Sequence, residues 1–254
     1  MPTLMKRATR VGARSALAAL STACGGGTDP LPQLGAATPA SLSGACDQLS
    51  SALAGLPNTQ ITLAETVAAG TLAQGGQPVA EHCRVTGKMH ERVSAVDGNT
   101  YAIGFEMRLP NAWNGRFYYQ ANGGLDGSVV PATGSYSSGV QVTSALLQGF
   151  AVISSDAGHT GAQNNTFGFD PQARLDYGYQ APQKLTPMAK NAIELAYGRA
   201  PDRSYFGGCS NGGRHTLVAT NRLAEEYDGF LAGAPGYNLP KAAVSQIWGA
   251  QQYA

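Results

Sequence analysis

The amino-acid sequence predicts an α/β protein with a mainly parallel sheet. Apolar, strand-like segments alternate along the chain with segments of helical periodicity. One junction between a strand and a helix carries the pattern Gly208-x-Ser210-x-Gly212, which is typical of parallel α/β folds. The sequence contains no internal repeat, so we expect one domain rather than a repeat array.

The expected elements follow from local patterns. Period-two alternation predicts a strand over 101–109, and a turn over 113–116 leads to a second strand over 116–120. A long loop rich in Gly and Ser follows over 122–139. A short helix, a buried strand, a helix, a strand, a helix and a last strand are then expected. In that order they cover residues 141–148, 150–155, 187–197, 204–207, 212–226 and 229–232.

Composition excludes several classes of protein. The 254 residues include 13% charged residues with a formal net charge of +1 and no run of Lys or Arg, so no nucleic-acid partner is expected. Hydrophobic residues make up 43%, which is too high for a disordered chain. The longest apolar stretches fall short of the ~18 residues that a membrane span requires, so no membrane span is expected.

The N-terminal region predicts export. Residues 1–23 combine a basic segment with a short apolar stretch and a small-residue cleavage pattern, as an export signal does. Cys24 and the three glycines after it resemble a bacterial lipoprotein junction, although Ser21 occupies the aliphatic position of that pattern. A lipid anchor at Cys24 and plain secretion therefore stay open. Residues 24–44 predict a flexible linker and 45–254 the domain. We expect a secreted, periplasmic or outer-membrane lipoprotein of a bacterium.

An oxidising compartment favours disulfides. Cys46 and Cys83 both lie in the N-terminal region, and the 37-residue loop between them would contribute about 4 kcal/mol, so they are the favoured pair. Cys209 then lacks a partner within the chain. A zinc site of His82, Cys83 and His90 is the alternative, but its spacing matches no standard ligand pattern, so no metal is expected.

The strongest chemical signal is the strand-to-helix junction around Ser210. The pattern Gly208-x-Ser210-x-Gly212 fits a nucleophile elbow, in which the serine occupies a strained turn and small neighbours allow strand and helix to approach. Ser210 would point out of the sheet edge. The N–H of Asn211, at the start of the following helix, would help to stabilise a developing oxyanion.

Two other interpretations of this junction exist. An ordinary Gly-rich turn has the same pattern. A phosphate-binding loop has the same spacing of Gly207 and Gly212, but Gly213-Arg214 stands where that loop requires Lys-Ser/Thr, so nucleotide binding is not expected.

A second oxyanion donor is expected from the loop that follows the 116–120 strand. Asn122-Gly123-Gly124 stands there, and glycine allows a backbone N–H to face a ligand without an intervening side chain. The alternative is a mobile surface loop. The functional interpretation is favoured because the loop follows a strand directly and precedes the elbow by one or two βα units.

Several segments resemble the tannase and feruloyl esterase family. The resemblance runs from about Cys46 to the last residue, and Cys-Ser-x-Gly-Gly-Arg over 209–214 is its most specific motif. The segments that carry it are 81–83, 113–117, the 122–134 loop, Asp156-x-Gly158-His159, 169–176, 208–214, 227–229 and 233–237.

The resemblance implies an α/β-hydrolase fold with a lid domain inserted near the C-terminal end of this chain. It implies hydrolysis of an aromatic-acid ester, with Ser210 as the nucleophile. The backbone N–H groups of Asn211 and of Gly123, or of Asn122, match the family's oxyanion hole.

The cysteines also match the family. Cys46 and Cys83 match an N-terminal disulfide, and Cys209 matches a cysteine that bridges to one beside the catalytic histidine. That second partner is not in this chain.

The sequence offers a candidate nucleophile but no clear candidates for the acid and the histidine of a catalytic triad. The order in α/β-hydrolases is Ser, then Asp or Glu, then His, on loops after later strands, and one predicted strand follows Ser210. His215 lies on the elbow helix, facing away from Ser210, while Asp156 and His159 precede the nucleophile and are interpreted as a structural turn. We therefore expect the N-terminal part of a longer enzyme, inactive by itself, with the triad acid and His, the lid and the C-terminal strands absent from this chain.

Two functions are carried forward. The first is a secreted serine esterase acting on feruloyl, galloyl or mono(2-hydroxyethyl) terephthalate esters, without a cofactor, although a calcium site in the lid stays open. The second is a non-catalytic, surface-tethered binding module on a hydrolase scaffold. Fold alone does not separate them; the elbow serine and the Gly-rich loop favour the esterase.

Overall fold

A computed structural model describes residues 34–135 and 143–253 of the chain. The export signal predicted over 1–23 and the lipoprotein junction predicted at Cys24 lie outside the described residues. The chain from Ala37 onward forms one compact unit, which contains every element discussed below.

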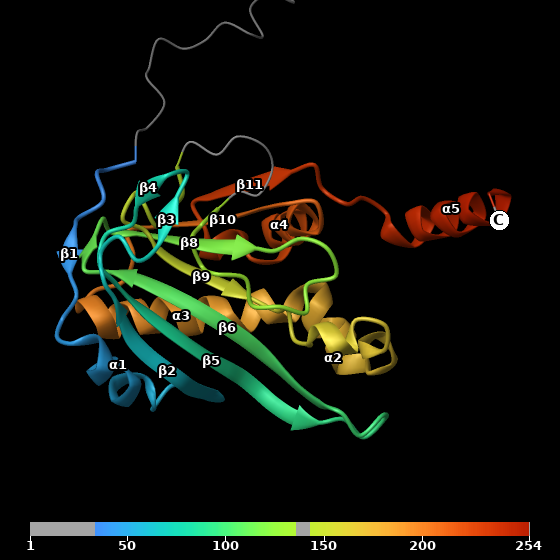
Figure 1. Cartoon of the computed structure of the whole chain (residues 1–254), viewed down its shortest axis with the longest axis horizontal. Helices are drawn as coiled ribbons and strands as arrows, with labels where there is room; N and C mark the ends of the chain where they lie inside the picture. Colours follow the sequence, from blue (N-terminus) through green and yellow to red (C-terminus); the bar gives the residue numbers. More distant parts are fainter. Residues whose placement is uncertain (1–33, 136–142, 254) are drawn as a thin grey trace, which may run out of the picture. The chain divides into compact units, whose positions relative to one another are not determined.

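Among the described residues, the central sheet has seven strands in the order β11-β10-β8-β9-β6-β5-β2 (Figure 1). Strands β9, β8, β10 and β11 run parallel to one another, while β6, β5 and β2 extend the sheet in antiparallel fashion. The bounds are β2 Thr59–Val67, β5 His82–Val93, β6 Thr100–Pro110, β8 Arg116–Ala121, β9 Ala151–Ser155, β10 Arg203–Cys209 and β11 Gly229–Gly233. The predicted α/β class is confirmed.

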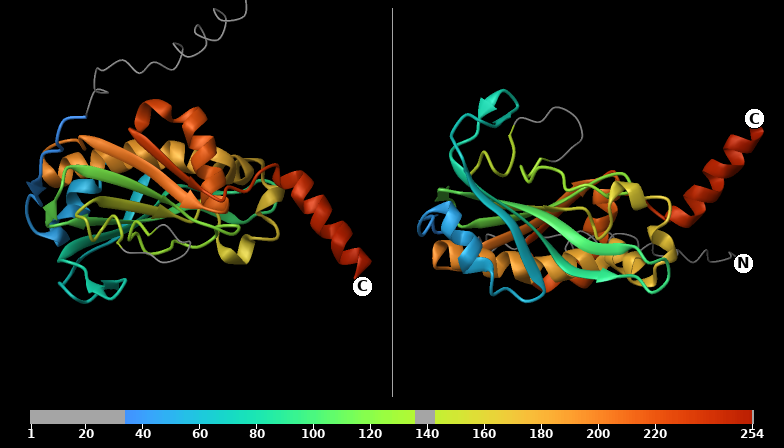
Figure 2. Two further views of the ribbon diagram at one scale, coloured as in Figure 1. Left: turned by 90° about the horizontal axis from the view of Figure 1, so that it is seen from above. Right: turned by 60° about the horizontal axis from the view of Figure 1, so that its bottom comes forward.

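Helices cover one face of the sheet. Helices α1 (Cys46–Leu53), α3 (Ala181–Tyr197) and α4 (Asn211–Arg222) contribute buried side chains to one apolar cluster with β5, β6 and β8 (Figure 2). The crossovers β9-α3-β10 and β10-α4-β11 run in the same direction across the sheet, so right-handed connections place both helices on the same face. The connection from β8 to β9 runs in the opposite direction.

Shorter elements complete the unit. A two-residue strand β1 pairs with β7, and β3 pairs with β4 in a small hairpin. A short helix α2 and one π-helical turn lead into α3, and α5 follows β11. The bounds are β1 Ala40–Ser41, β3 Ala73–Gln74, β4 Gln77–Pro78, β7 Ala112–Trp113, α2 Pro171–Leu175, the π-helical turn Asp176–Gln180 and α5 Leu239–Gln252; 3-10 turns cover Gly161–Gln163, Phe167–Phe169 and Ala224–Glu226.

Aromatic pairs fill the core between the sheet and the helices. Tyr119 of β8 stacks on Phe206 of β10 with ring centroids 4.5 Å apart, and Trp113 stacks on Tyr197 at the end of α3 at the same separation. All four side chains are buried. Large rings of this kind remove much apolar surface from water, so the first pair holds β8 against β10 and the second holds the end of α3 against β7.

The predicted disulfide is confirmed. Cys46 at the start of α1 is bonded to Cys83 of β5, with the two Cα atoms 5.4 Å apart. The bond ties α1 to the antiparallel part of the sheet and excludes the alternative in which Cys83 binds zinc. Cys209, at the end of β10, has no disulfide partner among the described residues.

Two boundary predictions are wrong. Residues 40–41, assigned to the flexible linker over 24–44, form β1, and the Thr38 N–H donates to Asp202 Oδ2 at 2.6 Å. The compact unit therefore begins at Ala37 rather than at residue 45. The helix predicted over 187–197 begins at Ala181, because the buried apolar face of α3 extends through Leu185 and outweighs the tendency of Pro187 to begin a helix.

The helix predicted over 141–148 is also wrong for its described part. Residues 145–149 form turns, in which the Gly149 N–H donates to Leu146 O at 2.9 Å. Gly149 has φ 83°, a left-handed conformation that ends the turn before the chain enters β9. Residues 141 and 142 lie outside the described residues. One turn fixes too few hydrogen bonds to propagate as a helix.

Candidate active site

The strand order of the sheet reverses at β8. The chain goes from β8 to β9 on one side and then returns across β8 to β10 on the other. The chain leaves β8 towards one face of the sheet and leaves β10 towards the other. Neither connection therefore covers the carboxyl ends of these two neighbouring strands. Ligands bind at such reversal points in parallel α/β sheets. The predicted elbow follows β10, and the predicted donor loop follows β8.

Ser210 has the strained backbone expected of an elbow. Its φ of 60° and ψ of −119° lie outside the regions favoured by residues other than glycine. Three backbone hydrogen bonds hold it there. The Ser210 N–H donates to Gly233 O at 3.0 Å, and Ser210 O accepts from Gly236 N at 3.1 Å and from Arg214 N at 3.0 Å. Strand β11 and the segment after it therefore support the turn from one side.

The glycines around Ser210 are required by close backbone packing. A Cβ atom at Gly208 or at Gly212 would overlap the carbonyl oxygen of Ala121, the last residue of β8. A Cβ atom at Gly213 would overlap the carbonyl oxygen of Gly233. Glycine at these positions thus lets the start of α4 rest directly on the ends of β8 and β11.

The segment over 122–127, here called the β8 loop, lies beside the elbow. The buried Asn122 side chain fixes its start, because Nδ2 donates to Ser154 Oγ at 3.0 Å and to Ser155 O at 2.8 Å on β9. A Cβ atom built on Gly123 would lie 3.8 Å from Cys209 O, which places Gly123 next to the end of β10. The loop is thus anchored and not freely mobile at Asn122.

Two backbone donors near Ser210 are unpaired. The N–H groups of Gly123 and of Asn211 have no hydrogen-bond acceptor among the described residues. Asn211 is the first residue of α4, where no intrahelical acceptor exists, and the positive end of the helix dipole lies there. Such donors are suited to binding an oxyanion.

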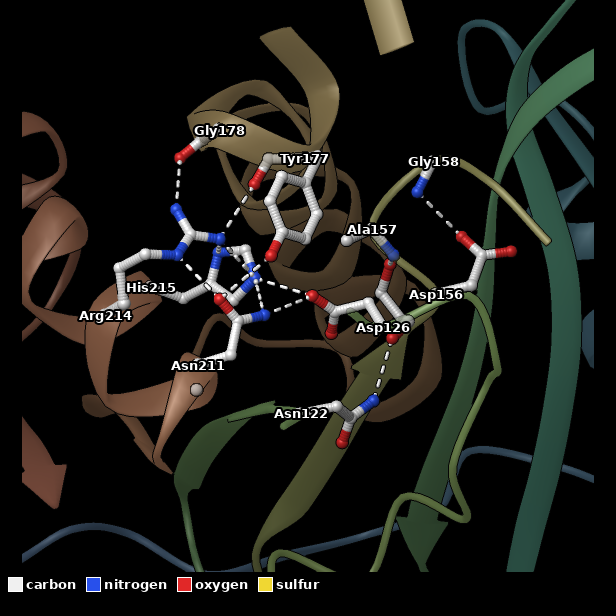
Figure 3. A network of polar contacts seen from close by, with 12 residues as sticks. Asn122, Asp126, Asp156, Ala157, Gly158, Tyr177, Gly178, Asn211, Arg214 and His215 are labelled. Atoms are coloured by element: carbon white, nitrogen blue, oxygen red, sulfur yellow. Dashed lines mark hydrogen bonds and ion pairs between the residues drawn. The ribbon is translucent and has the colours of Figure 1, made fainter. Parts of the chain in front are cut away.

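A buried polar network joins the β8 loop to the elbow helix (Figure 3). Asp126 Oδ2 accepts hydrogen bonds from Asn211 Nδ2 at 2.7 Å and from His215 Nε2 at 2.8 Å. Asn211 Oδ1 accepts from Arg214 Nε at 2.6 Å and from the Tyr177 hydroxyl at 3.2 Å. Burial raises the pKa of Tyr177, so this hydroxyl keeps its proton and donates.

The network contains residues for which the sequence alone predicts no functional role. Asp126, 89 residues from His215 along the chain, has no local signal beyond its position in a Gly-rich loop. Arg214 belongs to the family motif, and its guanidinium lies 4.6 Å from the centre of the Tyr177 ring. The sequence predicts that His215 lies on the elbow helix and faces away from Ser210, and in the structure its Nε2 pairs with Asp126 Oδ2.

No described residue forms a hydrogen bond with the Ser210 hydroxyl. His82 lies between Ala80 O and Arg108, and burial lowers its pKa. His159 bonds Asn164 Oδ1 and stacks on Phe167 with ring centroids 3.8 Å apart; burial lowers its pKa as well. His90, on β5, lies at a register shift of the β5-β6 pairing. Each described histidine thus either forms hydrogen bonds with residues other than Ser210 or lies on a strand distant from Ser210.

Asp156 is a buried carboxylic acid at the end of β9. Burial raises its pKa to about 7, although Oδ1 accepts hydrogen bonds from the N–H groups of Gly104 and Gly158, both at 2.9 Å, which favour the charged form. It has no hydrogen bond to Ser210 or to a histidine. The contacts are those of a turn that joins β9 to β6.

The described residues contain no cluster of three or more His, Cys, Asp or Glu side chains that could hold a metal. Within the same ranges, every helix is too short or too polar to cross a membrane.

Comparison with known proteins agrees with the resemblance. A family profile described as tannase and feruloyl esterase matches residues 83–253. The mono(2-hydroxyethyl) terephthalate hydrolase of Piscinibacter sakaiensis is 46% identical over 182 residues, which cover 68% of this chain and 30% of that protein. A probable feruloyl esterase B-2 of Neosartorya fischeri is 30% identical over 196 residues, which cover 72% of this chain and 34% of that protein.

A solved structure extends the comparison to the fold. Feruloyl esterase B from Aspergillus oryzae matches with a TM-score of 0.62 and 26% identity, over 76% of this chain and 37% of that one. The predicted α/β-hydrolase fold is confirmed by this likeness and by the sheet order. The chain spans about a third of the length of these relatives.

Proposed function

Because the chain belongs to the tannase and feruloyl esterase family, we propose that it forms the nucleophile-bearing part of a serine carboxylic-ester hydrolase acting on esters of aromatic acids. The observation that carries the proposal is the juxtaposition of three groups at the carboxyl ends of β8 and β10. Ser210 occupies a strained turn, and that turn is flanked by the unpaired N–H groups of Gly123 in the β8 loop and Asn211 at the start of α4. A nucleophile next to two preorganised donors is the arrangement that acyl transfer requires.

The proposed reaction has two covalent steps. The Ser210 hydroxyl oxygen attacks the ester carbonyl carbon while a base takes the hydroxyl proton, and the carbonyl oxygen becomes an oxyanion facing the Gly123 and Asn211 N–H groups. The carbon–oxygen bond to the alcohol then breaks as the protonated base returns its proton to the leaving oxygen. Water, deprotonated by the same base, attacks the acyl-serine and releases the aromatic acid and free Ser210.

The base and its orienting acid are proposed to come from outside residues 1–254. The described histidines are engaged elsewhere, and His215 in particular is occupied by Asp126. Cys209, adjacent to Ser210 and without a disulfide partner among the described residues, is proposed to bridge to a cysteine beside that base. On this proposal, the 254 residues alone do not turn over esters, because Ser210 without a base remains a neutral hydroxyl.

The proposed substrate class, esters of aromatic acids, is inferred from the names of the relatives. Their names refer to mono(2-hydroxyethyl) terephthalate and to feruloyl esters, and both molecules carry a planar aromatic acyl group. Export by the predicted signal over 1–23, with or without a lipid at Cys24, would bring the enzyme to such substrates outside the cytoplasm.

The proposal is tested with Ser210→Ala in the full-length protein that carries this chain. We expect kcat on feruloyl and mono(2-hydroxyethyl) terephthalate esters to fall by roughly 10⁶, as in serine hydrolases that lose the nucleophile. Ser51→Ala, an exposed serine of α1, is the matched control and should retain wild-type kcat. A loss below about tenfold in Ser210→Ala would refute the nucleophile. No ester turnover in the wild type would favour the non-catalytic binding module.

A further inference from the structure

The two unpaired donors lie on separate segments of the chain. Gly123 is in the β8 loop, and Asn211 begins α4, so their relative position depends on whatever ties these segments together. Oxyanion stabilisation requires both N–H groups at about 2.7–3.1 Å from a single point, and a small shift of one segment removes that coincidence. This inference rests on the proposed function.

Asp126 makes the side-chain tie between the two segments. One oxygen, Oδ2, accepts from both Asn211 Nδ2 and His215 Nε2, which stand one turn apart on α4. The carboxylate of Asp126 is 2% exposed and the imidazole of His215 is 5% exposed, so water does not compete for these bonds. A buried, charge-assisted pair of this kind fixes geometry more firmly than a surface pair does.

Asp126 and Gly123 belong to the same hydrogen-bonded turn, so a movement of Asp126 also moves Gly123. The Asp126 N–H donates to Gly123 O at 3.2 Å, which closes the turn between the two residues. Asp126 has φ 58°, a left-handed conformation that Asp and Asn tolerate better than other residues with side chains do. Releasing the Asp126 carboxylate from α4 would therefore allow the turn that presents Gly123 to move.

The orientation of the Asn211 amide is fixed from the other side. Its Oδ1 receives hydrogens from Arg214 Nε and from the Tyr177 hydroxyl, so its Nδ2 must face Asp126. Arg214 Nη2 in turn donates to Tyr177 O at 3.2 Å. The carboxylate thus meets an amide donor that cannot turn away, which makes the contact between the β8 loop and α4 specific.

We infer that Asp126 and His215 are positioning residues, whose pairing holds the β8 loop against the elbow helix so that the Gly123 and Asn211 N–H groups face one point. The pair neither supplies a proton to Ser210 nor contacts substrate. Its effect is on the stabilisation of the transition state, so it should appear in kcat rather than in KM.

The test compares Asp126→Asn with Glu106→Gln in the full-length protein. Asparagine keeps the left-handed backbone and the shape of Asp126 but lacks the charge and one acceptor. Glu106, also buried, accepts from Arg108 Nε at 2.7 Å and from Ala132 N at 2.9 Å, away from the elbow. It is a matched control for the loss of a buried, hydrogen-bonded carboxylate.

We expect Asp126→Asn to lower kcat by about tenfold to hundredfold, less than the loss of a whole oxyanion donor, with KM changed by less than about threefold. Glu106→Gln should lower the urea midpoint of unfolding but keep kcat within about twofold. Hydrogen exchange of peptides covering residues 120–128 should be several-fold faster in Asp126→Asn and unchanged in Glu106→Gln. A loss of kcat in Asp126→Asn no greater than in Glu106→Gln, or unchanged exchange, would overturn the inference.

Variants of His215 provide a second line of evidence. His215→Gln places an amide N–H near the position of Nε2 and should recover part of kcat, whereas His215→Phe, which keeps the ring but has no donor, should not. Equal loss in both variants would also contradict the pairing. If the wild-type protein has no esterase activity, the proposed function fails, but faster exchange in Asp126→Asn and His215→Phe still supports the tie between the loop and α4.

Discussion

At the scale of single residues, Ser210 and its neighbours were predictable because the information is local. The alternation of glycine around Ser210 encodes a tight turn, and the structure contains that turn with φ 60°. The partners of Asp126 were not predictable, because the Asp126–His215 contact joins positions 89 residues apart. A carboxylate in a loop has many candidate partners, and only the folded sheet selects one of them.

Asp156 should make stability depend on pH. Burial raises its pKa from 3.8 to about 7, so between these values the folded chain binds a proton that the unfolded chain has lost. The stability that this proton contributes is therefore fully present below about pH 4 and is lost as pH rises through about 7. The total change in the free energy of unfolding is about 4 kcal/mol.

Asp156→Asn removes this dependence. Asparagine Oδ1 can still accept from Gly104 N and Gly158 N, so the turn is retained without the charge. We expect the variant to unfold at a higher urea concentration than the wild type at pH 8, and the difference to shrink towards pH 4. Asp47→Asn, an exposed carboxylate of α1, should keep the wild-type pH profile. Identical profiles for Asp156→Asn and the wild type would show that Asp156 does not titrate in this range.

At the scale of elements, the sequence located β6 by its alternation, β8 by the turn before it and β9 as a buried apolar strand. It did not locate β2, whose residues are only partly buried and mix apolar with polar side chains. It misplaced the start of α3, because Pro187 suggested a beginning while burial of Ala181 and Leu185 decided otherwise. Tertiary packing outweighed local propensity at that point.

The contact between α4 and β8 depends on Gly212. A methyl group there would overlap Ala121 O and approach Asn122 O to 2.9 Å, and both are backbone atoms that cannot turn aside. We expect Gly212→Ala to lower the free energy of unfolding by roughly 3 kcal/mol, measured by urea denaturation. Gly178→Ala, in the π-helical turn with no atom within 4 Å of the new methyl group, should be neutral or slightly stabilising. Equal effects of the two substitutions would show that the elbow packs less closely than described.

At the scale of the whole molecule, the parallel strands and the antiparallel extension have different roles. The parallel strands β8 and β10 position the β8 loop and the elbow, while β6, β5 and the Cys46–Cys83 bond hold α1 and support the sheet from the far side. The sequence predicted the bond correctly because two cysteines in one region leave few alternatives. The chain spans about a third of the length of its relatives. We propose that the base for Ser210 comes from outside residues 1–254.

The central claim is that Ser210 receives the acyl group of an aromatic ester. We would mix the full-length protein with a feruloyl ester, quench within the first turnover with acid, and map the adduct by peptide mass spectrometry. The account predicts a mass increase of one feruloyl group on the peptide that contains Ser210, and no adduct in Ser210→Ala. Turnover with the feruloyl group on a different residue, or undiminished turnover in Ser210→Ala, would contradict it.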